Sequence, residues 1–196
     1  EGTQIRLREN GIGFSRINHI LISHMHGDHF YGLVPLLTSL HLLDRQKEMH
    51  IYGPPNLQET VEHLLKNTGA YLKYPLVFHL FEKGKKALIY EDNAIEVYTF
   101  PVKHSLPCWG FLFQEKPRPL NMRGELIEQL GIPHGEINAI KKGADFTDSK
   151  GKLYKNEILT KPAYPALSYA FCTDTAPVQR LPEYLKNPDI LYHEAT

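Results

Sequence analysis

Residues 20–43 contain three features whose order constrains the fold of this chain more than any other stretch. Ile20, Leu21 and Ile22 form a short apolar run rich in β-branched side chains, which predicts a buried strand. From residue 30 to 43, apolar side chains recur at helical spacing, which predicts an amphipathic helix. Between them lies the sequence Ser-His-Met-His-Gly-Asp-His, residues 23–29. A strand-to-helix turn is held by both of its neighbours, so it is the kind of loop that often carries chemistry.

The spacing within this turn indicates a metal site. In an extended loop, residues two apart point to the same side, so His24 and His26 can converge on one ion. Asp28 and His29 follow where the chain turns and can face a second ion about 3.5–4 Å away. Neutral imidazole and carboxylate ligands suit zinc or a similar transition metal. The alternative is a polar surface loop in a chain that holds 11 histidines, but three imidazoles and a carboxylate within six positions favour the metal.

Length and composition limit the domain organisation and the cellular setting that we expect. With 196 residues, 42% of them hydrophobic, the chain is expected to form one globular domain with a substantial core. It has no run of 18 apolar residues, so no membrane span is expected. No secretory signal is visible, although the chain opens at Glu1 without a methionine. Two cysteines, Cys108 and Cys172, give no disulfide framework, so a reducing cytoplasmic setting is expected.

The charges exclude one class of function and leave another open. The chain has 22 basic and 22 acidic residues and a formal net charge of zero. This balance argues against a generic nucleic-acid coat protein, but it permits a local basic patch.

Strands and helices are expected to alternate along the chain, which favours an α/β layered sandwich. Asn56 and Glu59 resemble a capping box at the start of a second helix, and Gly69 follows its end. The expected strands cover residues 18–23, 49–52, 76–81, 87–90, 94–101, 109–113, 168–172 and 190–192, and the expected helices cover 29–43, 57–67, 122–130 and 178–186.

Residues 116–164 have a different composition from the rest. Glycine and proline recur there among basic side chains, and only the helix at 122–130 has a clear pattern. We therefore expect an excursion away from the core of the domain.

Two later strands end in further candidate ligands. His104 follows the strand that ends near Val102, and Asp174 follows the apolar strand that ends at Cys172. Each also has an ordinary interpretation, His104 as a solvated side chain and Asp174 as a turn residue. His193-Glu194 closes the last strand in the same way. The remaining histidines lack such a setting and are interpreted as ordinary residues: His19, His41, His50, His63, His79 and His134.

Taken together, these segments resemble the metallo-β-lactamase superfamily, and within it the ribonuclease Z family of tRNA 3′-processing endonucleases. The His-x-His-x-Asp-His stretch at residues 24–29 carries the superfamily signature, whereas the block at 193–196 and the Gly-Ile-Pro-x-Gly segment at 131–135 narrow it to ribonuclease Z. The other matching segments are Glu1-Gly2-Thr3-Gln4, Phe30-Tyr31-Gly32-Leu33, Tyr52-Gly53-Pro54, His104-Ser105-Leu106-Pro107, Gly110-Phe111, Glu115-Lys116 and Ser168–Thr175.

The resemblance implies a four-layer αβ/βα sandwich, here a single domain over residues 1–196 with an arm-like insertion at 116–164. It implies two zinc ions per subunit, with manganese as the other candidate ion. His24, His26 and His104 would hold one ion, Asp28 and His29 the other, and Asp174 would bridge them. The family also places a further metal-binding histidine and a proton-donating histidine after the 193–196 block, and strands before residue 1. The chain is therefore expected to be an interior stretch of a longer protein.

The implied reaction removes the 3′ trailer from precursor tRNA and leaves a 3′-hydroxyl on the tRNA and a 5′-phosphate on the trailer. Asp28 would accept a proton from the attacking water, and Glu194 is a candidate partner for a histidine ligand, although it can equally be a residue that closes the strand. The arm-like segment would hold the tRNA through basic residues such as Arg118, Arg123, Lys141 and Lys142.

The family also implies a cytoplasmic homodimer. The competing hypotheses are a hydrolase of small phosphodiesters, sulfate esters, thioesters or lactones on the same scaffold, and an RNA-binding relative without metals.

Overall fold

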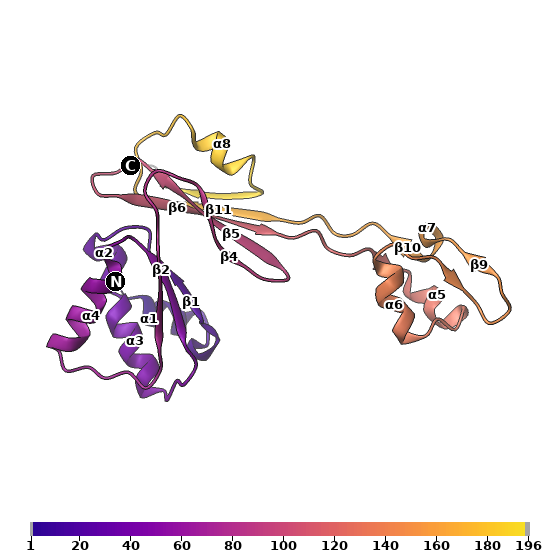
Figure 1. The fold of residues 1–196 in the computed structure, drawn as a ribbon, viewed down its shortest axis with the longest axis horizontal. Helices are drawn as coiled ribbons and strands as arrows, with labels where there is room; N and C mark the ends of the chain where they lie inside the picture. Colours follow the sequence, from indigo (N-terminus) through magenta and orange to yellow (C-terminus); the bar gives the residue numbers. More distant parts are fainter. Residues whose placement is uncertain (1, 195–196) are drawn as a thin grey trace. The chain divides into compact units, whose positions relative to one another are not determined.

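The structure, a computed structural model, describes residues 2–194. The chain divides into two compact units (Figure 1). Unit 1 comprises residues up to 113 and from 168 onward, and unit 2 comprises residues 114–167. Each unit is described by itself below.

The N-terminal half of unit 1 is built around a three-stranded parallel sheet. Its strands, in spatial order, are β1 (His19–Leu21), β2 (Met49–Gly53) and β3 (Leu76–Leu80). The helical elements of this half are α1 (Thr3–Glu9), the 3-10 turn Phe14–Arg16, α2 (Gly27–Phe30), α3 (Leu33–Leu42) and α4 (Leu57–Asn67). Because parallel strands need crossover connections, α2 and α3 link β1 to β2, and α4 links β2 to β3.

A second sheet of five strands completes unit 1. Its order is β12 (Ile190–His193), β11 (Ser168–Cys172), β6 (Cys108–Glu115), β5 (Ile95–Val102) and β4 (Ala87–Glu91). β11 and β12 are parallel and joined through α8 (Leu181–Leu185), whereas β4 and β5 form an antiparallel pair.

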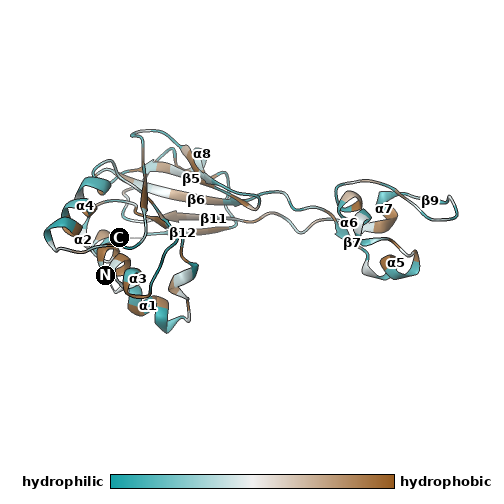
Figure 2. Cartoon of the chain, turned by 60° about the horizontal axis from the view of Figure 1, so that its bottom comes forward, coloured by the Kyte–Doolittle hydropathy of each residue, from teal (hydrophilic) through white to brown (hydrophobic). Residues whose placement is uncertain are grey.

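Three apolar clusters show that unit 1 is layered. The first joins α3 and α4 to one face of the three-stranded sheet, through residues such as Leu37, Ile51 and Val61. The second lies between the two sheets and includes Tyr52 and Trp109. The third packs α8 against the outer face of the five-stranded sheet: Phe100, Leu112, Ala170, Cys172, Tyr184 and Leu185. The order is helix, sheet, sheet, helix, and the brown segments of α3 and of the larger sheet in Figure 2 mark their hydrophobic residues.

Unit 2 has its own small core. Its elements are β7 (Asn121–Met122), α5 (Gly124–Gln129), α6 (His134–Lys141), β8 (Phe146–Thr147), β9 (Leu153–Tyr154), α7 (Asn156–Leu159) and β10 (Thr160–Lys161). Ile132, Ile140, Phe146 and Leu159 are buried together. Asn156 connects the start of α7 with the end of α6 and the residues after it, because its Nδ2 donates to the carbonyl oxygens of Ile140 (2.6 Å) and Ala144 (2.8 Å). The segment is therefore an ordered unit rather than a structureless loop.

The structure corrects several local expectations. The helix expected at 29–43 is divided at Tyr31 and Gly32 into α2 and α3. Asn56 precedes α4 but makes no side-chain capping bond, because its backbone (φ −89°, ψ 0°) lacks the extended conformation that a capping residue needs. Helices α1, α6 and α7 were not expected at all. Gly69 does end α4 in the left-handed region, at φ +64°.

Within residues 2–194, no helix is both long enough and apolar enough to cross a bilayer.

Candidate metal centre

The loop after β1 is fixed between the two sheets of unit 1. The Ile22 N–H donates to the carbonyl oxygen of Tyr52 (2.8 Å), which continues the pairing of β1 with β2. One residue later, the Ser23 carbonyl oxygen accepts from the Trp109 N–H of β6 (3.1 Å). His24 follows immediately and is fully buried. His26, in extended backbone conformation, is the N-cap residue of α2. The turn therefore presents its histidines at the edge shared by both sheets.

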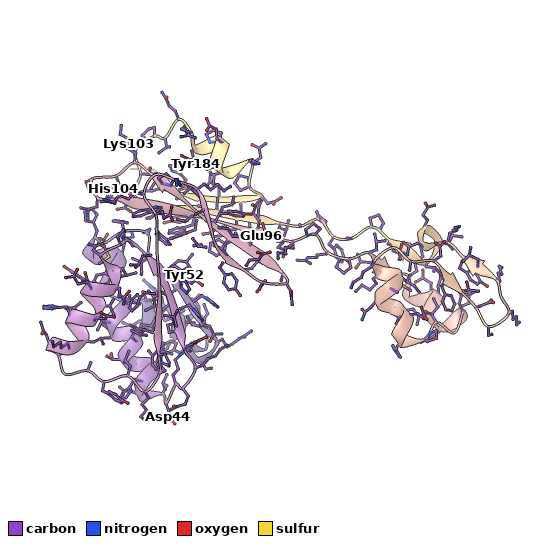
Figure 3. The ribbon with its side chains drawn as sticks, viewed as in Figure 1. Asp44, Tyr52, Glu96, Lys103, His104 and Tyr184 are labelled. Atoms are coloured by element: carbon purple, nitrogen blue, oxygen red, sulfur yellow. The ribbon has the colours of Figure 1, made fainter. Side chains whose placement is uncertain are left out.

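Three imidazole rings from two parts of the sequence meet at this edge. His26 Nδ1 lies 3.1 Å from His24 Nε2 and 3.0 Å from His104 Nε2. His104, labelled in Figure 3, follows Lys103 just beyond β5. Lys103 forms a backbone bridge to Ala176, and its N–H donates to Thr175 Oγ1 (3.1 Å). This bridge holds the loop that carries His104 against the loop that follows β11.

Asp174 supplies the fourth side chain, from the end of β11. Its Oδ2 lies 3.6 Å from His24 Nε2 and 3.7 Å from His104 Nε2, and its Oδ1 lies 3.2 Å from His29 Nε2. Its backbone has φ +25°, an uncommon value for a residue with a side chain and one often found at functional sites. The two carboxylate oxygens therefore face different groups of imidazoles.

The electrostatics of Asp174 favour its charged form. Burial acts to raise its pKa, but the hydrogen bond from Thr173 Oγ1 (2.9 Å) and the nearby His29, His24 and His104 outweigh burial, so the pKa is lowered. Asp174 is therefore a carboxylate at neutral pH, as a metal ligand must be.

His24 is held in one orientation by two buried neighbours. Its Nδ1 lies 3.0 Å from Ser23 Oγ and 3.5 Å from Cys108 Sγ. A hydrogen on Nδ1 can donate to these atoms, which leaves the Nε2 lone pair facing His26 and Asp174. Burial, followed by the neighbouring His29, lowers the pKa of His24 to about 4, so the ring is neutral at physiological pH. Burial also raises the pKa of Cys108 to about 12, so this thiol stays protonated.

Asp28 and His29 lie beside this group on α2. His29 Nε2 is 3.1 Å from Asp28 Oδ2, and it also approaches Asp174 as described. The Asp28 side chain is 74% exposed, whereas that of His29 is 24% exposed. Asp28 therefore combines a position next to the buried imidazoles with access to solvent.

The donor set fits a transition-metal ion. One ligand atom each from His24, His26, His104 and Asp174 lies within 4.8 Å of the others. Four ligands at about 2.0–2.1 Å from a tetrahedral zinc ion would be about 3.3 Å apart. The separations of 3.0, 3.1, 3.6 and 3.7 Å among these atoms lie on either side of that value. Neutral imidazoles with one carboxylate suit a divalent ion of intermediate softness.

The other residues singled out in the sequence lie outside this group. The Glu194 N–H donates to the Cys172 carbonyl oxygen (3.0 Å), and the charge of its carboxylate contributes to the raised pKa of Cys108. Ala195 and Thr196 of the same motif lie outside the described residues, as does Glu1.

The four basic candidates all belong to unit 2. Arg118 pairs with Glu115, Arg123 Nε donates to the Thr160 carbonyl oxygen (3.1 Å), and Lys141 and Lys142 lie at the end of α6. The structure therefore places them on one compact unit.

Comparison with known proteins assigns the chain to a family. The family model described as "Anti-Pycsar protein Apyc1" matches residues 2–116, which is more than half of the chain. The chain belongs to this family. The matched part of this Apyc1-family chain contains the whole His24–His29 turn and His104, but it ends as unit 2 begins.

The resemblance to ribonuclease Z is confirmed. It extends beyond residue 116, where the match of this Apyc1-family chain to its family model ends. Ribonuclease Z of Bacteroides thetaiotaomicron is 43% identical over 196 residues, which is all of this chain and 62% of that protein. Ribonuclease Z of Bacteroides fragilis (strain YCH46) is 40% identical over the same length, and the chain spans 64% of it. Both matches include unit 2 and Asp174.

A solved structure agrees with the layered architecture. The crystal structure of human tRNase Z, short form, matches with a TM-score of 0.54 and 28% identity, over 59% of this chain and 51% of that one. The α/β layered sandwich predicted from the sequence is therefore confirmed for this Apyc1-family chain.

Proposed function

We propose that the protein is a metal-dependent endoribonuclease that removes the 3′ trailer from precursor tRNA. The observation that carries this proposal is the similarity to ribonuclease Z over all 196 residues, through both the histidine cluster and unit 2. The chain spans 62% of the length of that relative. The activity is therefore proposed for the full-length protein that contains this sequence.

Zinc is the ion we propose, two per subunit, with manganese as the alternative. His24, His26 and His104 would hold one ion, Asp28 and His29 the other, and Asp174 would contact both through its two oxygens. When bound, such ions lower the pKa of water toward neutrality and offset negative charge on a phosphodiester.

The chain's own residues then have distinct tasks. Ser23 fixes the tautomer of His24, and Thr173 holds the Asp174 carboxylate. Asp28, which is exposed beside His29, would orient the attacking water and accept its proton. Water oxygen would bond to phosphorus while the bond from phosphorus to the tRNA 3′ oxygen breaks, and the departing oxygen would take up a proton from solvent. The products are a tRNA 3′-hydroxyl and a trailer with a 5′-phosphate. For Glu194 we propose the role of a partner that orients a histidine ligand.

Unit 2 would recognise the folded RNA. Its small core gives Arg118, Arg123, Lys141 and Lys142 a stable platform from which to meet phosphates, and the shape of a tRNA is suited to contacts that do not read bases. On the same resemblance we expect a cytoplasmic homodimer.

The test is cleavage of a 3′-extended precursor tRNA by the full-length protein in the presence of zinc. We expect a cut just after the discriminator base, a loss of roughly a thousandfold in His26→Ala, and no change in His63→Ala, because His63 lies on the exposed face of α4 and contacts Asn67. A zinc-loaded protein that leaves precursor tRNA intact would contradict the proposal.

A hydrolase of small phosphodiesters, sulfate esters, thioesters or lactones is the second candidate, because the matched family model ends where unit 2 begins. Replacing residues 118–162 with a short linker separates the two. A ribonuclease should lose tRNA cleavage yet still hydrolyse a chromogenic phosphodiester. Hydrolysis of the chromogenic phosphodiester without any cleavage of precursor tRNA, whether residues 118–162 are present or replaced, would favour the small-molecule hydrolase.

A further inference from the structure

Three histidines outside the metal centre gather on the three-stranded sheet of unit 1. His19, His50 and His79 lie on β1, β2 and β3, which are neighbours in space. The register pairs His19 with His50, and it pairs Tyr52 with His79. Alternation along each strand directs Ile20, Ile51 and Phe78 toward α3 and α4, so the three histidines occupy the opposite face. We call them, with Glu48 and Tyr52, the β-face cluster.

Two of these rings are within direct contact distance. His50 Nδ1 lies 3.0 Å from His79 Nε2. The other nitrogen of His50, Nε2, lies 3.2 Å from Glu48 Oε1. A hydrogen on Nε2 therefore donates to the carboxylate, and the Nδ1 lone pair of His50 is directed at His79. A carboxylate behind an imidazole is the arrangement that commonly orients histidine ligands of metal ions.

Stacking holds the rings in place. His19 stacks on His50 with centroids 4.9 Å apart, and Tyr52 stacks on His79 with centroids 4.3 Å apart. His19 Nδ1 also lies 3.3 Å from the Tyr52 hydroxyl, and Tyr52 is buried (Figure 3 labels it on β2). The ligand atoms are thus oriented in advance, so little rotamer entropy would be lost on binding.

His19 and His79 are also in the protonation state that a metal requires. Burial, together with the neighbouring His50, lowers the pKa of His19 and of His79. Both are therefore neutral at pH 7 and have a lone pair to offer. The His50 side chain is 24% exposed, so water can reach the pair and fill further coordination positions.

We propose that the β-face cluster is a second transition-metal site, in which His50 Nδ1 and His79 Nε2 bind a divalent ion such as Zn²⁺ in place of the hydrogen between them. Glu48 is a positioning residue for His50. Its distance from the ion would be too long for direct ligation, because it contacts the opposite ring nitrogen. The site is separate from the His24 cluster, since none of its residues belongs to that group.

Zinc alone is the probe for the test. The zinc-free full-length protein is dialysed to equilibrium against increasing Zn²⁺, and bound metal per chain is measured. We expect His50→Ala and His79→Ala to bind one equivalent less than the wild type, and His63→Ala, an exposed histidine of α4, to bind the same amount.

Glu48→Gln provides the second variant, because the side chain of Glu48 is 52% exposed and its loss does not disturb packing. Here we expect unchanged stoichiometry and an affinity for the additional zinc lower by about 10–100-fold. Equal zinc binding by the wild type, His50→Ala and His79→Ala would overturn the proposal and leave a shared hydrogen bond as the role of the pair. An equal loss in His63→Ala would overturn it too, because the binding would then be nonspecific.

Discussion

Ser23 Oγ lies 3.0 Å from Nδ1 of His24, whose other ring nitrogen faces His26 and Asp174. Both residues are buried, so bulk water does not compete with the hydroxyl in the native protein. Ser23→Ala should therefore lower the affinity for the first metal ion by about 10–100-fold, because the Nδ1 of His24 loses the nearer of its two partners and keeps only the weaker Cys108 thiol. Zinc binding by competition with a chelator measures the change. Ser149→Ala, at an exposed turn of unit 2, is the matched control and should bind zinc as the wild type does.

Tyr74 provides a prediction about alkaline pH. Burial raises the pKa of Tyr74 to about 12, and its hydroxyl donates to the Leu37 carbonyl oxygen of α3 (2.8 Å). Because the folded pKa exceeds the ordinary value of 10, the contribution to stability is complete below pH 10 and is lost as pH rises toward 12. Urea unfolding at neutral and alkaline pH should show a steeper decline in the wild type than in Tyr74→Phe. At neutral pH that variant should be less stable by about 0.5–1.5 kcal/mol. Parallel declines in the two proteins would refute this account.

Gly110 on β6 has no room for a side chain. A Cβ there would approach Phe100 to 2.5 Å and the Phe171 carbonyl oxygen to 3.0 Å, and Phe100 is fully buried. Gly110→Ala should therefore destabilise unit 1 by about 1–3 kcal/mol through overpacking. Gly135→Ala is the control, because nothing lies within 4 Å of its Cβ and it sits in α6. Thermal unfolding should separate the two variants, and a Gly110→Ala protein as stable as the wild type would show that the sheet can adjust.

The two lysines at the end of α6 test the proposed role of unit 2. Replacing Lys141 and Lys142 with glutamate should weaken precursor tRNA binding. It should also reduce the slope of log affinity against log salt by about 0.7–0.9 for each lost phosphate contact. Filter binding at several salt concentrations measures both quantities. A matched double change at exposed lysines of unit 1, Lys66 and Lys85, should leave the slope unchanged. If both double variants behave alike, unit 2 has no special part in binding.

Much of the fold could be predicted because its signals are local. The helix at 57–67 and the strand at 168–172 were predicted with the bounds that the structure gives, since their apolar periodicity is strong and each ends at a clear break. Helices α1 and α6 were missed because they are short, largely exposed and rich in polar residues. The break between α2 and α3 was missed because apolar spacing continues across Gly32.

The residues of the candidate site also divide into those that local sequence patterns could reveal and those that they could not. His24 and His26 could be found from spacing alone, since two residues of one loop must lie close together. His104 and Asp174 are far away in sequence. Their positions at strand ends made them candidates, and the resemblance to ribonuclease Z then favoured them as ligands of the same site. The β-face cluster could not be predicted, because the register of three strands, which no local pattern encodes, brings His19, His50 and His79 together.

The candidate ligands of the first ion come from both sheets of unit 1, with His24 following β1 and Asp174 following β11. An ion that joins them closes a chain loop from residue 24 to residue 174, and long loops are those whose closure most restricts the unfolded chain. The ion would then act as a removable cross-link as well as a reagent. Chelation would release a clamp between two halves of the core, so metal-depleted protein should show the earliest amide exchange where Trp109 meets Ser23.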